Sequence, residues 1–79
     1  MQYILGFKTR LGPVFIGQTP DGRYHPVWKG QSLGAYPSSV AAIDDVARGH
    51  TYSPSDGTEL AELEISPDIG WWLPAEALM

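Results

Sequence analysis

The sequence of 79 residues contains no cysteine. Disulfide bonds and thiolate metal sites are therefore excluded, and so small a fold must derive its stability from packing or association. The sequence also lacks an apolar run long enough for a membrane span, and no basic segment precedes a long apolar stretch, as it would in a secretory signal. We therefore expect one soluble, cytoplasmic domain that does not contact a membrane.

Basic residues are scarce in the second half of the chain. Residues 1–40 carry four cations and one carboxylate, whereas residues 41–79 carry one cation and eight carboxylates. The formal net charge of the whole chain is −4. Such an acidic half either forms a solvated surface that maintains solubility or docks on a basic partner.

The motifs of common catalytic, phosphate-binding and calcium sites are also missing. There is no G-x-S-x-G sequence, no phosphate-binding glycine loop and no D-x-D-x-D-G pattern. The two histidines, His25 and His50, form no HxxxH or HxxE spacing. We therefore predict a protein that is not an enzyme and has no cofactor or metal ion, in which His25 is a strand residue and His50 bonds a carbonyl at a helix end.

Apolar residues alternate between turn signals over the first 36 residues. This pattern predicts an antiparallel meander of three or four strands. Pro20-Asp21-Gly22 is typical of a hairpin turn, because glycine accepts the positive φ that the turn requires. Pro26 cannot donate a ladder hydrogen bond, so we expect an edge position or a bulge there. The expected strands are residues 2–8, 14–18, 23–29 and 32–36.

A helix is predicted over residues 39–48. Ser38 can cap its first turn, and Gly49 is a typical residue just beyond its end. Asp44 and Arg48 are spaced to form a favourable pair on one helix face. The apolar stripe expected to face the sheet consists of Val40, Ile43, Val46 and Ala47.

The chain after the helix is expected to be irregular, with short helical turns. Thr58 is expected to cap a turn that runs to Leu63. Ser66 is expected to cap a second turn, which has Pro67 at its first position and ends before Pro74. The fold class is therefore α+β, within one domain divided into a sheet (1–36), a helix (38–49), a covering segment (50–73) and a frayed tail (74–79).

Both faces of the predicted sheet carry apolar side chains. On the first strand, for example, Tyr3, Leu5 and Phe7 alternate with Ile4. One short helix covers only one face, and an uncovered aromatic face is too large for an ordinary monomer. We therefore expect the second face to be covered by residues 65–73, including both C-terminal tryptophans, or else by a partner or a second copy of the chain.

The preferred functional hypothesis is an accessory protein that binds another protein, with aromatic anchors and an acidic segment that attracts a basic partner. Its candidate residues are Tyr24, Trp28, Trp71, Trp72, Asp56, Glu59 and Glu62. The alternative is a nucleic-acid-binding β-hairpin, which the acidic net charge disfavours. Its candidate residues are Lys8, Arg10, Arg23 and Lys29.

Two resemblances accompany these expectations. The stretch "LGAY…SSVAAIDDVA", within residues 14–48, resembles the last strand and the helix of plant AP2-type and integrase N-terminal domains. That resemblance implies a three-stranded sheet backed by a helix, although those domains place more arginines on the sheet. Residues 21–72, with "GxY…AIDDVARGHT", "SPSDG" and "ISPDIGWW", resemble small bacterial proteins of unassigned role, which implies no activity.

Overall fold

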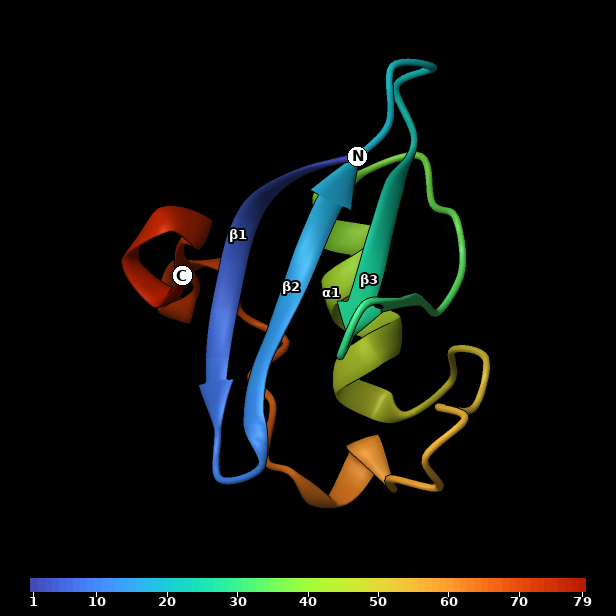
Figure 1. The fold of residues 1–79 in the computed structure, drawn as a ribbon, viewed down its shortest axis with the longest axis vertical. Coiled ribbons are helices and arrows are strands. Elements are labelled where there is room, and N and C mark those ends of the chain that lie inside the picture. Colours follow the sequence, from blue (N-terminus) through green and yellow to red (C-terminus); the bar gives the residue numbers. More distant parts are fainter.

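The computed structural model describes residues 1–79 and has the predicted α+β class (Figure 1). Five strands form one antiparallel sheet in the order β4-β3-β2-β1-β5, and one α-helix packs on it. β1 to β4 form the predicted meander, whereas β5 was not predicted and pairs antiparallel with β1. The strands are β1 (Gln2–Thr9), β2 (Gly12–Gln18), β3 (Tyr24–Trp28), β4 (Gln31–Ser32) and β5 (Leu73–Pro74).

The first three strands lie within two residues of their predicted bounds, but β4 is much shorter than expected. Its pairing ends at Ser32, and the Leu33 N–H then donates to the Pro26 carbonyl. Gly34 has a φ of 145°, a value that L side chains rarely adopt, and the chain bends there. Only an isolated bridge between Tyr24 and Tyr36 continues the pairing.

A β-bulge in β1 changes which side chains share a face. The pairing register shifts between Tyr3 and Leu5. Leu5 therefore lies opposite Ile16 and packs against the core beneath the helix. Tyr3 faces the other side of the sheet and stacks on Phe15, with the two ring centroids 4.8 Å apart. The prediction that Tyr3 and Leu5 point the same way is wrong, because a bulge inserts one extra residue into the alternation.

The helix α1 (Ser39–Arg48) has the predicted bounds and both predicted caps. The Ser38 hydroxyl accepts a hydrogen bond from the Ala41 N–H at 3.1 Å. Gly49 has a φ of 71°, in the left-handed region, and its N–H closes the last turn. These local signals therefore fix both ends of the helix.

The exposed pair of α1 forms as predicted, whereas the buried stripe differs from the prediction at two positions, Val40 and Ala42. Arg48 Nε donates to Asp44 Oδ1 at 3.1 Å, as expected. The residues buried against the sheet are Ala42, Ile43 and Val46. Val40, predicted to belong to this stripe, is 59% exposed because it lies on the flank of the helix.

Replacement of Ser38 by alanine is expected to cost about 1 kcal/mol of unfolding free energy, because the first turn loses its side-chain cap. The Ser39 hydroxyl makes no hydrogen bond, so Ser39→Ala is the matched control, and we expect it to be near neutral. Urea unfolding followed by far-ultraviolet circular dichroism measures both effects. Equal midpoints for the parent and the Ser38 variant would show that this cap does not stabilise the helix.

Three 3₁₀ helices follow α1, namely η1 (Leu60–Glu62), η2 (Ile69–Trp71) and η3 (Ala75–Leu78). Their caps differ from the predictions. Glu59, without a side-chain bond, precedes η1 in place of Thr58. The cap of η2 is Asp68 and not Ser66, because the Asp68 carboxylate reaches the Gly70 N–H at 2.8 Å while the Ser66 hydroxyl accepts from the Asp68 N–H.

One hydrophobic core lies between the sheet and α1. It also receives side chains from the segment that contains η1 and from the residue after η2. No helix has the length and apolarity that crossing a membrane requires. The buried core residues are Val14, Ile16, Trp28, Leu33, Ala42, Ile43, Val46, Leu60, Leu63, Ile65 and Trp72.

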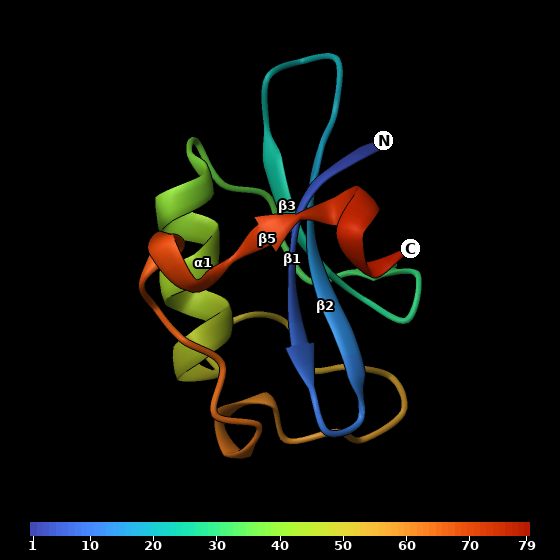
Figure 2. The ribbon, with the colours of Figure 1, turned by 90° about the vertical axis from the view of Figure 1, so that its left-hand side faces the viewer.

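On the sheet face opposite α1, η3 packs over β1 and the adjoining part of β2 (Figure 2). Leu78 lies so close to Gly6 that a Cβ atom added there would be 2.7 Å from Leu78 Cδ1. The prediction that Trp71 and Trp72 cover this face is wrong, because Trp72 packs in the core beside Phe7 and Trp71 points to solvent. The tail predicted to fray instead supplies the cover, since β5 fixes its path across the sheet edge.

Candidate functional site

The turn η2 presents two adjacent tryptophans to different environments. Trp72 is 5% exposed, and its indole Nε1–H donates to the Ser66 carbonyl at 2.9 Å. Its ring packs on Phe7, with centroids 5.5 Å apart. Trp71 is 71% exposed, the largest exposure of any tryptophan in the chain. Because Trp72 leaves the turn in an extended conformation toward β5, its neighbour is left on the outside.

Trp71 is the centre of an exposed apolar surface. Ile69 and Leu73, two residues to either side of it, are 44% and 48% exposed. Val40, on α1, is 59% exposed as well, and Figure 2 shows the turn at η2 passing in front of this helix. We refer to Val40, Ile69, Trp71 and Leu73 as the Trp71 surface. A solitary exposed apolar residue is ordinary, but several that include a tryptophan are typical of interaction sites.

The orientation of α1 places Val40 on the flank toward β1 and β5. Asp45 lies on the opposite flank, and its carboxylate faces Tyr36. Tyr36 forms an isolated bridge with Tyr24 of β3. Burial, followed by the neighbouring Asp45 carboxylate, raises the pKa of Tyr36 to about 12. Since the buried stripe separates the two flanks, Val40 lies on the flank of α1 away from Tyr36.

Backbone and side-chain bonds fix the shape of the Trp71 surface. The Trp71 N–H donates to the Asp68 carbonyl at 3.1 Å, and the Trp72 N–H donates to the Ile69 carbonyl at 3.0 Å. The Asp68 cap and the buried indole of Trp72 anchor the same turn at both ends. The backbone that carries Ile69, Trp71 and Leu73 is therefore held in place by bonds within the chain.

Carboxylates border this surface on two sides. Asp68 directly precedes Ile69 and is exposed, and Asp44 lies one helical turn after Val40 on the same flank of α1. Arg48 is the cation on that flank, and it is paired with Asp44. The immediate surroundings of the Trp71 surface are therefore acidic.

Trp28 was predicted to anchor a partner, but it is buried in the core with 1% of its surface exposed. Its indole Nε1–H donates to Asp56 Oδ2 at 3.0 Å, and the Lys29 ammonium lies 5.4 Å from the centroid of its ring. Trp28 therefore ties the 50–58 loop to β3. It is unavailable to a partner, as is Trp72, because both indoles are used inside the fold.

Tyr24 is half-buried and has a partner within the chain. Its hydroxyl accepts a hydrogen bond from Gln18 Nε2 at 3.2 Å, and its ring packs against the core. It lies on β3, separated from the Trp71 surface by β2 and β1. Tyr24 and Trp71, predicted as parts of one binding surface, are therefore not brought together.

The acidic candidates occupy another end of the molecule. Asp56 accepts hydrogen bonds from the Thr58 N–H and from Trp28, and these contacts, led by those from Thr58, lower its pKa. Glu59 and Glu62 are exposed at η1, at the bottom of Figure 1 near the β1–β2 turn. They add to the long-range negative potential but do not border the Trp71 surface.

The four cations of the nucleic-acid hypothesis do not form one surface. Lys8 and Arg10 lie at the β1–β2 end of the sheet, and Lys29 lies in the β3–β4 turn at the same end. Arg23 lies in the β2–β3 turn, which projects from the opposite end (Figure 1). Arg10 Nη1 also donates to the Glu62 carbonyl at 3.1 Å. Phosphate binding requires clustered cations, and this arrangement separates Arg23 from the other three.

His25 joins a polar network on the outer sheet face. Its Nε2 lies 3.2 Å from the Thr19 hydroxyl and its Nδ1 lies 3.1 Å from the Ser32 hydroxyl. Thr19 in turn donates to Asp21, and this bond lowers the pKa of the Asp21 carboxyl. His25 thus reaches a carboxylate only through Thr19. His50 contributes its backbone N–H, not its ring, to the Asp45 carbonyl at 2.9 Å.

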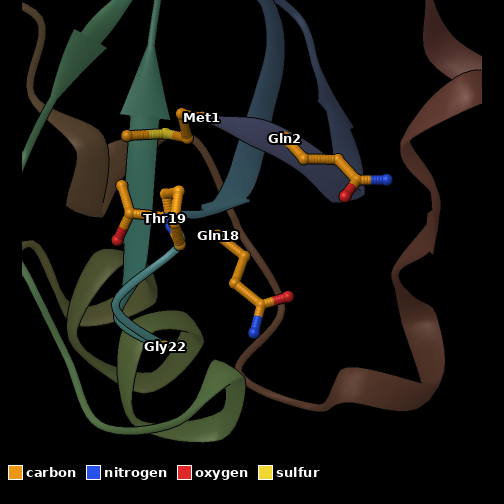
Figure 3. Close-up of a pocket in the computed structure, with 6 residues that line it drawn as sticks. Met1, Gln2, Gln18, Thr19 and Gly22 are labelled. Carbon is orange, nitrogen blue, oxygen red and sulfur yellow. The ribbon is translucent and has the colours of Figure 1, made fainter.

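A shallow pocket of about 470 Å³ lies beside the β2–β3 turn (Figure 3). It is lined by Met1, Gln2, Gln18, Thr19, Pro20 and Gly22. Figure 3 shows the amide groups of Gln2 and Gln18 turned to the same side, as expected for two residues paired across β1 and β2. Amides can form hydrogen bonds with a ligand, but no side chain of this pocket can act as an acid, a base or a strong nucleophile at neutral pH. No cluster of three or more histidines or carboxylates capable of holding a metal ion is present in the chain.

No family model, curated protein or solved structure matches this chain. Sequence reasoning identified Trp71 but did not include Val40, Ile69 or Leu73. Alternation is the signal that could have indicated Leu73, since Trp72 is extended and residues two apart share a face in an extended segment. Ile69 lies in the 3₁₀ turn η2, where no such alternation applies.

Proposed function

We propose that this chain is a small, non-catalytic, cytoplasmic accessory domain that binds another protein through the Trp71 surface. One observation carries the proposal: Trp71 is 71% exposed between two partly exposed aliphatic residues, Ile69 and Leu73. An indole contributes a large buried area when a partner covers it, and tryptophan is enriched among the residues that dominate interface energetics.

The local structure supports this role for Trp71. The fold already has a buried tryptophan at the next position, so Trp71 is not needed to complete the core. The hydrogen bonds of η2 hold its backbone in place, which limits the conformational entropy lost on binding to the Trp71 side chain and to the partner. These features are those of a preorganised anchor.

Replacement of Trp71 by alanine is expected to abolish capture of the natural partner while the fold remains intact. Removing a central aromatic anchor typically costs at least about 2 kcal/mol of binding free energy, or more than about tenfold in affinity. Affinity capture from the native host, quantified by mass spectrometry, compares the parent with this variant.

Leu11→Ala provides the matched control for that experiment. Leu11 is 49% exposed in the β1–β2 turn, far from η2, so its removal tests whether any loss of apolar surface has the same effect. We expect at least one protein to be retained by the parent and the Leu11 variant and lost from the Trp71 variant. Identical capture by all three proteins would contradict the proposal.

A further inference from the structure

We infer that the partner of the Trp71 surface is a basic segment in which lysine or arginine residues surround an apolar centre. This inference rests on the proposed function and adds the chemistry of the partner. The apolar centre follows from Ile69, Trp71 and Leu73, which a partner must cover with apolar side chains. The sign of the partner's charge follows from the residues that border these three.

The border of the Trp71 surface carries negative charge that the chain does not neutralise. One carboxylate oxygen of Asp68 accepts a hydrogen bond from the Gly70 N–H, and Asp68 forms no ion pair. Asp44 is paired with Arg48, so that pair contributes no net charge. The other four cations lie on the meander and its turns, whereas the carboxylates after α1 extend the negative potential around η1 and η2.

The negative charge beside the Trp71 surface favours some classes of partner over others. A second copy docked by a two-fold axis would bring Asp68 of one copy close to the same acidic border of the other, and like charges in an interface oppose association. Nucleic acids and anionic lipid surfaces carry the same sign and would also be repelled. A basic segment binds favourably for two reasons. Its apolar centre covers Trp71, and its cations face the acidic border.

A direct test uses a fluorescein-labelled amphipathic peptide composed of leucine and lysine, with a leucine and glutamate peptide of the same length and pattern as the control. We expect the leucine–lysine peptide to bind the full chain, with an affinity that falls as NaCl is raised. Trp71 is the exposed tryptophan, so its emission should shift to the blue when the peptide covers it. The leucine–glutamate peptide should not bind.

Three variants connect that binding to the surface. Trp71→Ala should weaken the peptide affinity by more than about tenfold, as expected for a central anchor. Asp68→Asn should weaken it severalfold while keeping the η2 cap, because an asparagine oxygen can accept from the Gly70 N–H. Glu59→Gln removes an exposed carboxylate at η1 and should have a smaller effect than Asp68→Asn.

The outcomes separate this inference from the proposed function. If the leucine–lysine peptide fails to bind, or binds equally well to the Trp71 variant, the basic partner is wrong, while Trp71-dependent capture from the host would still support the proposed function. Binding of duplex DNA or of RNA that depends on Trp71, or a Trp71-dependent dimer in sedimentation, would also overturn the inference. Salt-sensitive binding of the leucine–lysine peptide that requires both Trp71 and Asp68 supports it.

Discussion

Replacement of Trp72 by alanine is expected to destabilise the protein by about 3–5 kcal/mol, the usual cost of removing a large aromatic side chain from a core. The indole is almost fully buried and packs on Phe7, and its Nε1–H donates to the Ser66 carbonyl. The variant therefore loses apolar contacts, creates a cavity and leaves a carbonyl without its partner. A domain of this length has only about 5–10 kcal/mol of stability, so the loss is a large fraction of the total.

Trp71→Ala is the matched control, because it removes the same side chain one residue earlier. We expect it to change the unfolding free energy by less than about 0.5 kcal/mol, since surface substitutions are usually near neutral. Thermal and urea unfolding of the two variants give the comparison. Should the Trp72 variant not fold, Trp72→Phe retains part of the packing and allows a smaller loss to be measured. Equal losses at the two positions would contradict the assignment of one indole to the core and the other to solvent.

The helix could be predicted closely because its signals are local. Ser38 bonds the Ala41 N–H within one turn, Gly49 supplies the left-handed residue at the other end, and the bounds of α1 follow. The first three strands likewise follow from alternation and from turn residues that act over short distances. In these elements the signals operate between neighbours in the sequence, and the predicted bounds agree with the structure to within two residues.

The two tryptophans at the end of η2, Trp71 and Trp72, could not be assigned in the same way. They are the same residue type at adjacent positions, so the sequence does not distinguish them. Which of the two is buried depends on the direction of the turn η2, which Asp68 caps and which leads into β5. β5 itself has two residues, one of them Pro74, so no strand pattern marks it. It forms because Leu73 meets Gly6 across a sheet edge that is distant in sequence, and only the folded chain brings them together.

The candidate residues have different environments in the structure. Trp71 is exposed and lies near the carboxylate of Asp68, whereas Trp28 and Trp72 are buried. Trp28 resembled an anchor in the sequence because nothing in a single strand reveals what packs on it. Its burial depends on α1 and on a loop that begins more than twenty residues later.

Trp28→Ala is expected to cost at least as much as the loss of Trp72, about 3–5 kcal/mol, because Trp28 lies at the centre of the core. It also leaves Asp56 without its indole partner, so the 50–58 loop should loosen from β3. Equilibrium urea unfolding measures the first effect, and amide hydrogen exchange of the loop measures the second. Trp28→Phe separates them, since phenylalanine keeps most of the apolar volume but has no N–H to donate.

The pH dependence of stability provides an independent check on the Trp28–Asp56 bond. The folded pKa of Asp56 is lowered, first by the hydrogen bonds from Thr58 and then by the bond from the Trp28 indole. A carboxyl whose folded pKa lies below its unfolded value stabilises the protein above the unfolded pKa, and this contribution is lost as the pH falls through the folded pKa.

Asp56→Asn should therefore lose less stability than the parent between about pH 5 and about pH 3. Part of the acid sensitivity should remain, because the bond from Thr19 lowers the pKa of Asp21 in the same direction. If Trp28→Phe and the parent lose the same stability over this range, the indole contributes nothing to the ionised state of Asp56. The attachment of the loop then depends on the Gln31 side chain, which bonds Ser53 and Ser55, and on the bond from the Tyr52 N–H to the Leu33 carbonyl.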